Sequence, residues 1–120
     1  MASATKAEKQ RVLLVEDEYF IAIEIVQALE GGGAVAVGPT RSVKEALQMM
    51  ESQPIDAAIL DINLHNQPVF PLADELELRK VPFVFATGYG AQAIPARFRG
   101  VPRFEKPLDL DALVRAVTAH

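Results

Sequence analysis

The feature that most constrains this chain is a series of short, uninterrupted apolar runs separated by segments with helical periodicity. Four runs are clear, at residues 12–15, 35–37, 57–60 and 83–86, and a weaker fifth spans residues 101–104. Continuous rather than alternating hydrophobicity is typical of strands that are buried on both faces, as in a parallel sheet. The repeated order of strand and helix therefore predicts a five-stranded parallel sheet with helices on both faces.

Helical patterns occupy the intervals between these runs. Residues 18–30 are apolar over most of a helix circumference, and residues 70–79 form another pattern with prolines near its start. Ser42 and Glu45 have the spacing of a capping box, which predicts a helix that begins after Ser42. Asp109 has the side chain and position needed to cap a last helix.

Length and composition limit the classes of function. The chain has 120 residues, which allows one domain, at 11–120, behind a polar tail at 1–10. It has no cysteine, so disulfides, zinc-thiolate sites and thiol catalysis are excluded. A net charge of −4 with interspersed signs argues against a nucleic-acid partner. Without a signal peptide or an apolar run near the ~20 residues of a membrane helix, we expect a soluble, cytosolic protein with no membrane partner.

Reactive side chains follow four of the five runs. Because the carboxyl ends of parallel strands meet at one edge of a sheet, three carboxylates, one hydroxyl and one ammonium group are expected to converge there. The second run ends in Gly38-Pro39-Thr40 and is expected to contribute no chemistry. The groups after the other four runs are Glu16-Asp17, Asp61, Thr87-Gly88 and Lys106-Pro107.

Such a cluster suits phosphoryl transfer. Neighbouring carboxylates repel one another, and Mg²⁺ (or Mn²⁺) would compensate them while also binding phosphate oxygens. Asp61 would act as the nucleophile and form an aspartyl phosphate, and Lys106 would neutralise charge on the phosphoryl oxygens. Thr87 would offer its hydroxyl to one of these oxygens, and Gly88 would let the backbone approach closely. Each residue alone has an ordinary explanation as a cap, turn or surface residue, but capping does not explain four converging strand ends.

These residues also resemble a known family. The segments VLLVEDE, AILDINL, FVFATGYG and FEKPL, in this order over residues 11–118, resemble the receiver domain of bacterial two-component response regulators. FATGYG is similar to the signature of the FAT GUY receiver subgroup. The resemblance implies a flavodoxin-like (βα)5 doubly wound fold and a stand-alone signalling phosphoacceptor. Such a domain is not a turnover enzyme, although it catalyses its own phosphorylation and slow dephosphorylation.

The resemblance also implies metal ligands and a phosphodonor. Asp17 would bind magnesium directly, and Glu16 would do so directly or through a water. Asp61 would bind the metal and accept the phosphoryl group from a phosphohistidine on a histidine kinase or a histidine phosphotransfer protein. The backbone carbonyl of Asn63 would be a further ligand, and Thr87 would move toward the phosphoryl group on activation.

Further roles follow from the same resemblance. Lys106 would bridge to the phosphoryl group, and its peptide bond to Pro107 would be cis. Asn63 and Tyr89 occupy positions that tune self-dephosphorylation. The protein would be a monomer or weak dimer whose output is protein contact if the chain is complete. Partners would dock on the first helix, where the candidate residues are Phe20, Ile21 and Glu24.

Two positions depart from the family pattern. Arg103 stands where most receivers carry the Tyr or Phe of a rotameric switch, which puts the usual threonine-to-aromatic coupling in doubt. Pro95 interrupts the stretch 91–99, so we expect this segment to be short or mobile. The two histidines, His65 and His120, carry little weight, since a lone loop histidine is more often a surface residue.

Three alternatives remain open from the sequence. A haloacid-dehalogenase-like phosphatase would also form an aspartyl phosphate, but it needs an acid/base Asp where Asn63 stands. A pseudo-receiver would keep the fold as an interaction module without using phosphate. A receiver that belongs to a longer protein is the third alternative, because His120 ends just where a last helix would.

Overall fold

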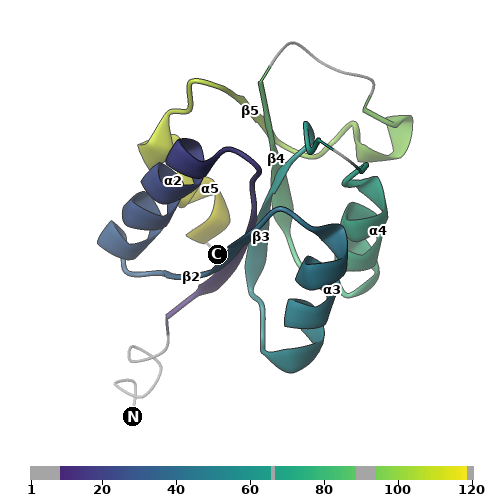
Figure 1. Cartoon of the computed structure of the whole chain (residues 1–120), viewed down its shortest axis with the longest axis horizontal. Coiled ribbons are helices and arrows are strands. Elements are labelled where there is room, and N and C mark those ends of the chain that lie inside the picture. Colours follow the sequence, from purple (N-terminus) through teal and green to yellow (C-terminus); the bar gives the residue numbers. More distant parts are fainter. Residues whose placement is uncertain (1–8, 66, 89–93, 119–120) are drawn as a thin grey trace.

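One parallel sheet with helices on both sides forms the protein (Figure 1). The computed structural model describes residues 9–65, 67–88 and 94–118. The strand order is β2-β1-β3-β4-β5, which confirms the doubly wound fold predicted from the apolar runs. In chain order the elements are β1 (Arg11–Val15), α2 (Tyr19–Gly31), β2 (Val35–Thr40), α3 (Val43–Ser52), β3 (Ala57–Asp61), α4 (Phe70–Leu78), β4 (Phe83–Thr87), the 3₁₀ helix η1 (Ala96–Phe98), β5 (Arg103–Glu105) and α5 (Leu110–Thr118).

Two apolar clusters, one on each face, explain why the strands read as continuous apolar runs. Helices α2 and α5 cover one face of the sheet, and α3 and α4 cover the other (Figure 1). In β1, Val12 and Leu14 belong to the cluster under α2 and α5, whereas Leu13 and Val15 belong to the opposite cluster. Strands β3 and β4 divide in the same way. Within the described part of the chain, no helix is long and apolar enough to span a membrane.

Only half of the predicted capping box forms. The Ser42 hydroxyl accepts a hydrogen bond from the Glu45 amide at 3.1 Å, as expected. The Glu45 carboxylate accepts instead from the Thr40 hydroxyl at 2.6 Å, and the Ser42 amide donates to that same hydroxyl oxygen. The prediction for the Glu45 side chain was therefore wrong, because Thr40 at the end of β2 supplies a closer partner. Asp109 caps α5 as predicted, with Oδ1 accepting from the Ala112 amide.

Strand β2 is longer than predicted and reaches the functional edge of the sheet. Gly38 has φ of 106°, and a Cβ at this position would lie 2.8 Å from the backbone oxygen of Leu14. The Glu16 amide donates to the Thr40 carbonyl at 2.9 Å, which ties the end of β2 to the end of β1. Arg41 follows directly and lines a pocket together with Asp17, His65 and Gln67.

The described part of the segment after β4 contains one short turn of helix. Residues 89–93 lie outside the described residues, and in the described remainder of the 91–99 stretch the only helix is η1, which Pro95 precedes. The expected shortness is therefore confirmed for that remainder. Phe98 of η1 is buried against an aromatic cluster of Phe70, Phe83 and Phe85.

Candidate functional site

The ends of β1, β3 and β5 bring two buried carboxylates and one ammonium group together. Glu16 is 4% exposed and Asp61 is 1% exposed. The Lys106 Nζ lies 3.0 Å from Glu16 Oε2 and 3.5 Å from Asp61 Oδ2. Glu18, which the sequence analysis did not select, adds a third carboxylate at 3.6 Å from the same nitrogen. Negative charge therefore exceeds positive charge around Lys106.

Burial and the neighbouring charges shift the pKa values of Glu16 and Lys106. Burial, followed by the charge of Asp61, raises the pKa of Glu16 to about 7. Burial alone would lower the pKa of Lys106, but its hydrogen bond to Glu16 and the charge of Asp61 raise it above the ordinary value. Glu16 Oε1 is buried, and none of the described residues is its hydrogen-bond partner. A buried oxygen without a partner is costly, which makes this edge receptive to a cation.

A backbone network holds the loops after β3 and β4 around Asp61. The Asn63 amide donates to Asp61 Oδ1 at 2.8 Å, and Asn63 Oδ1 accepts from the Gly88 amide at 2.9 Å. The Lys106 amide donates to the carbonyl oxygen of Thr87, and Thr87 is fully buried. Asn63 therefore links the two loops through its side chain. The Lys106-Pro107 peptide bond is cis, as the resemblance implied.

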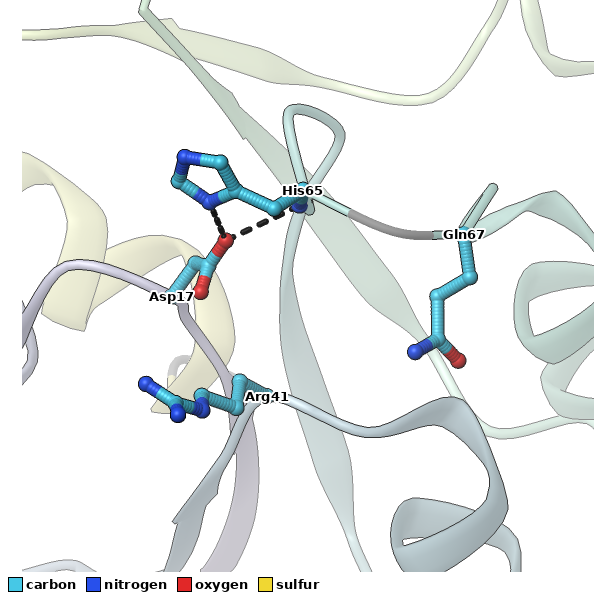
Figure 2. Close-up of a pocket in the computed structure, with 4 residues that line it drawn as sticks. All are labelled: Asp17, Arg41, His65 and Gln67. Atoms are coloured by element: carbon cyan, nitrogen blue, oxygen red, sulfur yellow. Dashed lines mark hydrogen bonds and ion pairs between the residues drawn. The ribbon is translucent and has the colours of Figure 1, made fainter.

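The Asp17 carboxylate contacts His65 and not Lys106. In the pocket of Figure 2, which Arg41 and Gln67 also line, Asp17 Oδ2 accepts hydrogen bonds from the His65 amide at 2.9 Å and from the His65 ring at Nδ1. Burial raises the pKa of Asp17, but the hydrogen bonds from His65 outweigh it and lower the pKa below its ordinary value. The same contact raises the pKa of His65. The His65 side chain is exposed as expected, but the sequence analysis missed its partner.

The predicted metal ligands are therefore assembled only in part. Among the described residues, no three His, Cys, Asp or Glu side chains are grouped so that they could hold a metal ion. The donors still fit a hard divalent cation chemically, because Glu16 and Asp61 present oxygen ligands and Glu16 Oε1 lacks a partner. Asp17, whose Oδ2 accepts from His65, does not join this group in the structure.

The other predicted site residues have different settings. Phe20 is 79% exposed and Glu24 is exposed, whereas Ile21 is half-buried against the cluster under α2, which disfavours Ile21 as a docking residue. Tyr89 lies outside the described residues. Arg103 is exposed at the start of β5, so an arginine and not a buried aromatic ring occupies the switch position.

A doubly wound α/β domain with an acidic edge and an adjoining lysine defines a class of phosphate-handling signalling domains. The response regulator receiver domain family matches residues 12–118. The chain belongs to this family.

Solved structures agree over most of the chain. SdrG from Sphingomonas melonis Fr1 is 39% identical, with a TM-score of 0.79 and coverage of 90% of this chain and 92% of SdrG. The BeF3-activated conformation of SdrG from Pseudomonas melonis Fr1 is 40% identical, with a TM-score of 0.75 and coverage of 88% and 91%. These likenesses support receiver function in a phosphorelay and do not favour a pseudo-receiver or a phosphatase.

Curated relatives are longer proteins. The sensory transduction protein LytT of Enterococcus faecalis is 38% identical over 71% of this chain, and the match spans 36% of LytT. LytT of Bacillus cereus is 33% identical over 92% of this chain and 46% of its own length. The chain thus spans less than half of the curated relatives that it matches.

Proposed function

We propose that this receiver accepts a phosphoryl group on Asp61, in a magnesium-dependent reaction, from a phosphohistidine on a histidine kinase or histidine phosphotransfer protein. The observation that carries the proposal is the position of the Asp61 carboxylate, which is 1% exposed at the end of β3 and lies 3.5 Å from the Lys106 ammonium. A buried carboxylate held beside a lysine suits a nucleophile whose product carries additional negative charge.

The transfer forms one bond and breaks another. An oxygen of Asp61 attacks phosphorus, and the bond between phosphorus and the donor imidazole nitrogen breaks, leaving its electron pair on that nitrogen. Lys106 stands between Glu16 and Asp61 and can shift toward the phosphoryl oxygens without leaving the site. Thr87 would donate its hydroxyl to another phosphoryl oxygen. The other ring nitrogen of the phosphohistidine carries a proton in this step, so the products are an aspartyl phosphate and a neutral histidine.

The residues that would hold the metal are Asp61, Glu16, Asp17 and the backbone carbonyl of Asn63. Bound Mg²⁺, or Mn²⁺ in its place, would compensate the carboxylates and neutralise charge on the phosphoryl oxygens. The partnerless Glu16 Oε1 supports this assignment. Burial, followed by the charge of Asp61, raises the pKa of Glu16 to about 7, and a bound cation would favour the ionised carboxylate again.

Asn63 and Tyr89 would set the lifetime of the phosphoryl group. The Asn63 side chain accepts from the Gly88 amide, so it stands at the entrance between the loops that follow β3 and β4. A side chain there would control how water approaches the phosphorus. We further propose that the domain works as a monomer or weak dimer and signals through protein contact.

Intact mass after incubation with magnesium and a small phosphodonor tests the proposal. We expect a single phosphoryl adduct on the parent protein, lost in Asp61→Asn and lost when magnesium is chelated. Asp111→Asn is the matched control, because Asp111 is an exposed aspartate in the first turn of α5. If neither the small donor nor phosphorylated kinases gave an adduct on a folded protein, the pseudo-receiver alternative would replace this function.

A further inference from the structure

We propose that His65 is a positioning residue that withholds Asp17 from the cation site, so that a divalent cation must compete with the Asp17–His65 contact. This inference rests on the proposed magnesium site. It names a residue that would set the affinity of that site for magnesium. Two donors of one residue, the backbone amide at 2.9 Å and the ring Nδ1, meet on Asp17 Oδ2. The ring can donate as a neutral tautomer with its proton on Nδ1, so the contact does not require a charged histidine.

The contact joins two strand ends that should both serve the cation. Asp17 follows β1 and His65 follows β3, and Figure 2 shows the imidazole directed at the Asp17 carboxylate. While Oδ2 accepts both hydrogen bonds, the carboxylate does not join Glu16 and Asp61 in a group that could hold a metal ion. A cation that binds through Asp17 Oδ2 would therefore replace the hydrogen bond from the His65 ring by coordination.

The geometry also allows release. The His65 side chain is 79% exposed, whereas that of Asp17 is 9% exposed, so the imidazole can swing into water while the carboxylate stays beside the site. A contact in which one partner is this exposed contributes little free energy, so it can weaken cation binding without preventing it. The His65 amide remains as a weaker partner after the ring has left.

The opposite role makes an opposite prediction. A histidine that donates to a ligating carboxylate can orient it and strengthen metal binding. Removing such a histidine weakens the affinity, whereas removing a competitor strengthens it. The direction of the change in magnesium affinity therefore decides between the two roles, and a merely structural role for His65 would change it in neither direction.

A magnesium titration without phosphodonor, followed by the amide chemical shifts of Asn63 and Gly88, measures this affinity. We expect His65→Ala to bind magnesium about twofold to fivefold more tightly than the parent. His65→Asn is the matched control, because its amide nitrogen can replace Nδ1 as the donor, and we expect the parent affinity to return.

Each other outcome overturns the inference. Weaker binding by His65→Ala would make His65 a supporting partner of the cation site. Equal binding by the parent, His65→Ala and His65→Asn would show that His65 does not affect magnesium affinity, while the magnesium site itself would stand. If neither the parent nor His65→Ala bound magnesium, the site under the proposed function would fail, and the inference with it.

Discussion

At the scale of single residues, one ammonium group faces more negative charge than it can neutralise. Lys106 Nζ lies within 3.6 Å of oxygens from Glu16, Asp61 and Glu18. Of these, Glu16 is the buried carboxylate with a partnerless oxygen, and its pKa is raised to about 7. Without a bound cation, Glu16 therefore holds a proton at pH values where an ordinary glutamate has lost it.

This raised pKa predicts how stability depends on pH. Between the ordinary value of 4.5 and about 7, the folded protein holds a proton on Glu16 that the unfolded chain has released. The metal-free protein should therefore lose stability as pH rises through this window, by up to about 3 kcal/mol from this group. Denaturant unfolding at several pH values between 5 and 8, without magnesium, measures the loss.

Glu16→Gln isolates the contribution of this residue. The raised pKa of His65 also makes stability fall as pH rises. Because His65 is present in both the parent and Glu16→Gln, its contribution cancels when the two free energies of unfolding are subtracted. The free energy of unfolding of Glu16→Gln relative to the parent should thus increase from pH 5 to pH 8. A difference that stays constant over this range would show that Glu16 titrates normally.

The sequence predicted some site residues better than others for a physical reason. Asp61 ends β3, whereas Glu16 and Lys106 directly follow β1 and β5, and the pairing of these strands fixes where the three side chains begin. Asp17 and His65 lie 48 residues apart, and their contact depends on the path of the loop after β3. No local pattern encodes such a path, so neither the partner of Asp17 nor the role of His65 could be predicted.

At the scale of elements, η1 is held to the sheet by one buried ring. Phe98 is 1% exposed and stacks on Phe70, with further edge contacts to Phe83 and Phe85. Arg97 next to it makes two hydrogen bonds to the Asp74 carboxylate of α4. These contacts hold η1 against α4 and the sheet.

Phe98→Ala should therefore destabilise the protein by about 3–5 kcal/mol, since it removes a fully buried aromatic side chain. Phe20→Ala is the matched control, because the same truncation at a ring that is 79% exposed should change stability by no more than about 0.5 kcal/mol. Denaturant unfolding of both variants makes the comparison. Similar losses in both would mean that Phe98 is not the anchor of η1.

Strand β2 gives a second prediction at this scale. Gly38→Ala should cost about 1–3 kcal/mol, because the residue has φ of 106° and its new Cβ would lie 2.8 Å from the Leu14 carbonyl oxygen. Gly31→Ala is the control, since nothing lies within 4 Å of a Cβ there, and it should leave stability equal or raise it by at most about 1 kcal/mol. Thermal unfolding of the two variants measures both effects, and a tolerated Gly38→Ala would contradict the need for glycine.

Elements were predictable where burial on both faces produced a continuous pattern. The first, third and fourth runs match β1, β3 and β4 closely for this reason. The length of β2 was underestimated because Gly38 and Pro39 are typical turn residues, yet here they remain within the strand. The side chain of Glu45 was misassigned because its partner, Thr40, belongs to the preceding strand and not to the helix.

At the scale of the whole molecule, the doubly wound topology places the acidic edge beside the start of α2. Tyr19 and Phe20 open that helix, are 70% and 79% exposed, and contact each other edge to face. Phe20, Glu24 and Gln27 are all exposed, and their spacing places them on one stripe of this helix. Exposed aromatic rings close to a reaction site are suited to a protein partner.

We therefore predict that Phe20→Ala slows phosphotransfer from a phosphorylated histidine kinase or phosphotransfer protein by about tenfold or more, as expected for losing an aromatic interface residue. Phosphorylation by a small donor should keep its parent rate, because Phe20 is 79% exposed at the start of α2 and is not one of the proposed transfer residues. Leu78→Ala is the control, since Leu78 is 76% exposed on α4, which covers the opposite face of the sheet. Rates of phosphoryl transfer to the three proteins test this prediction. Equal slowing in Phe20→Ala and Leu78→Ala would show that the effect comes from general surface hydrophobicity. An unchanged rate in Phe20→Ala would show that the partner does not dock on Phe20.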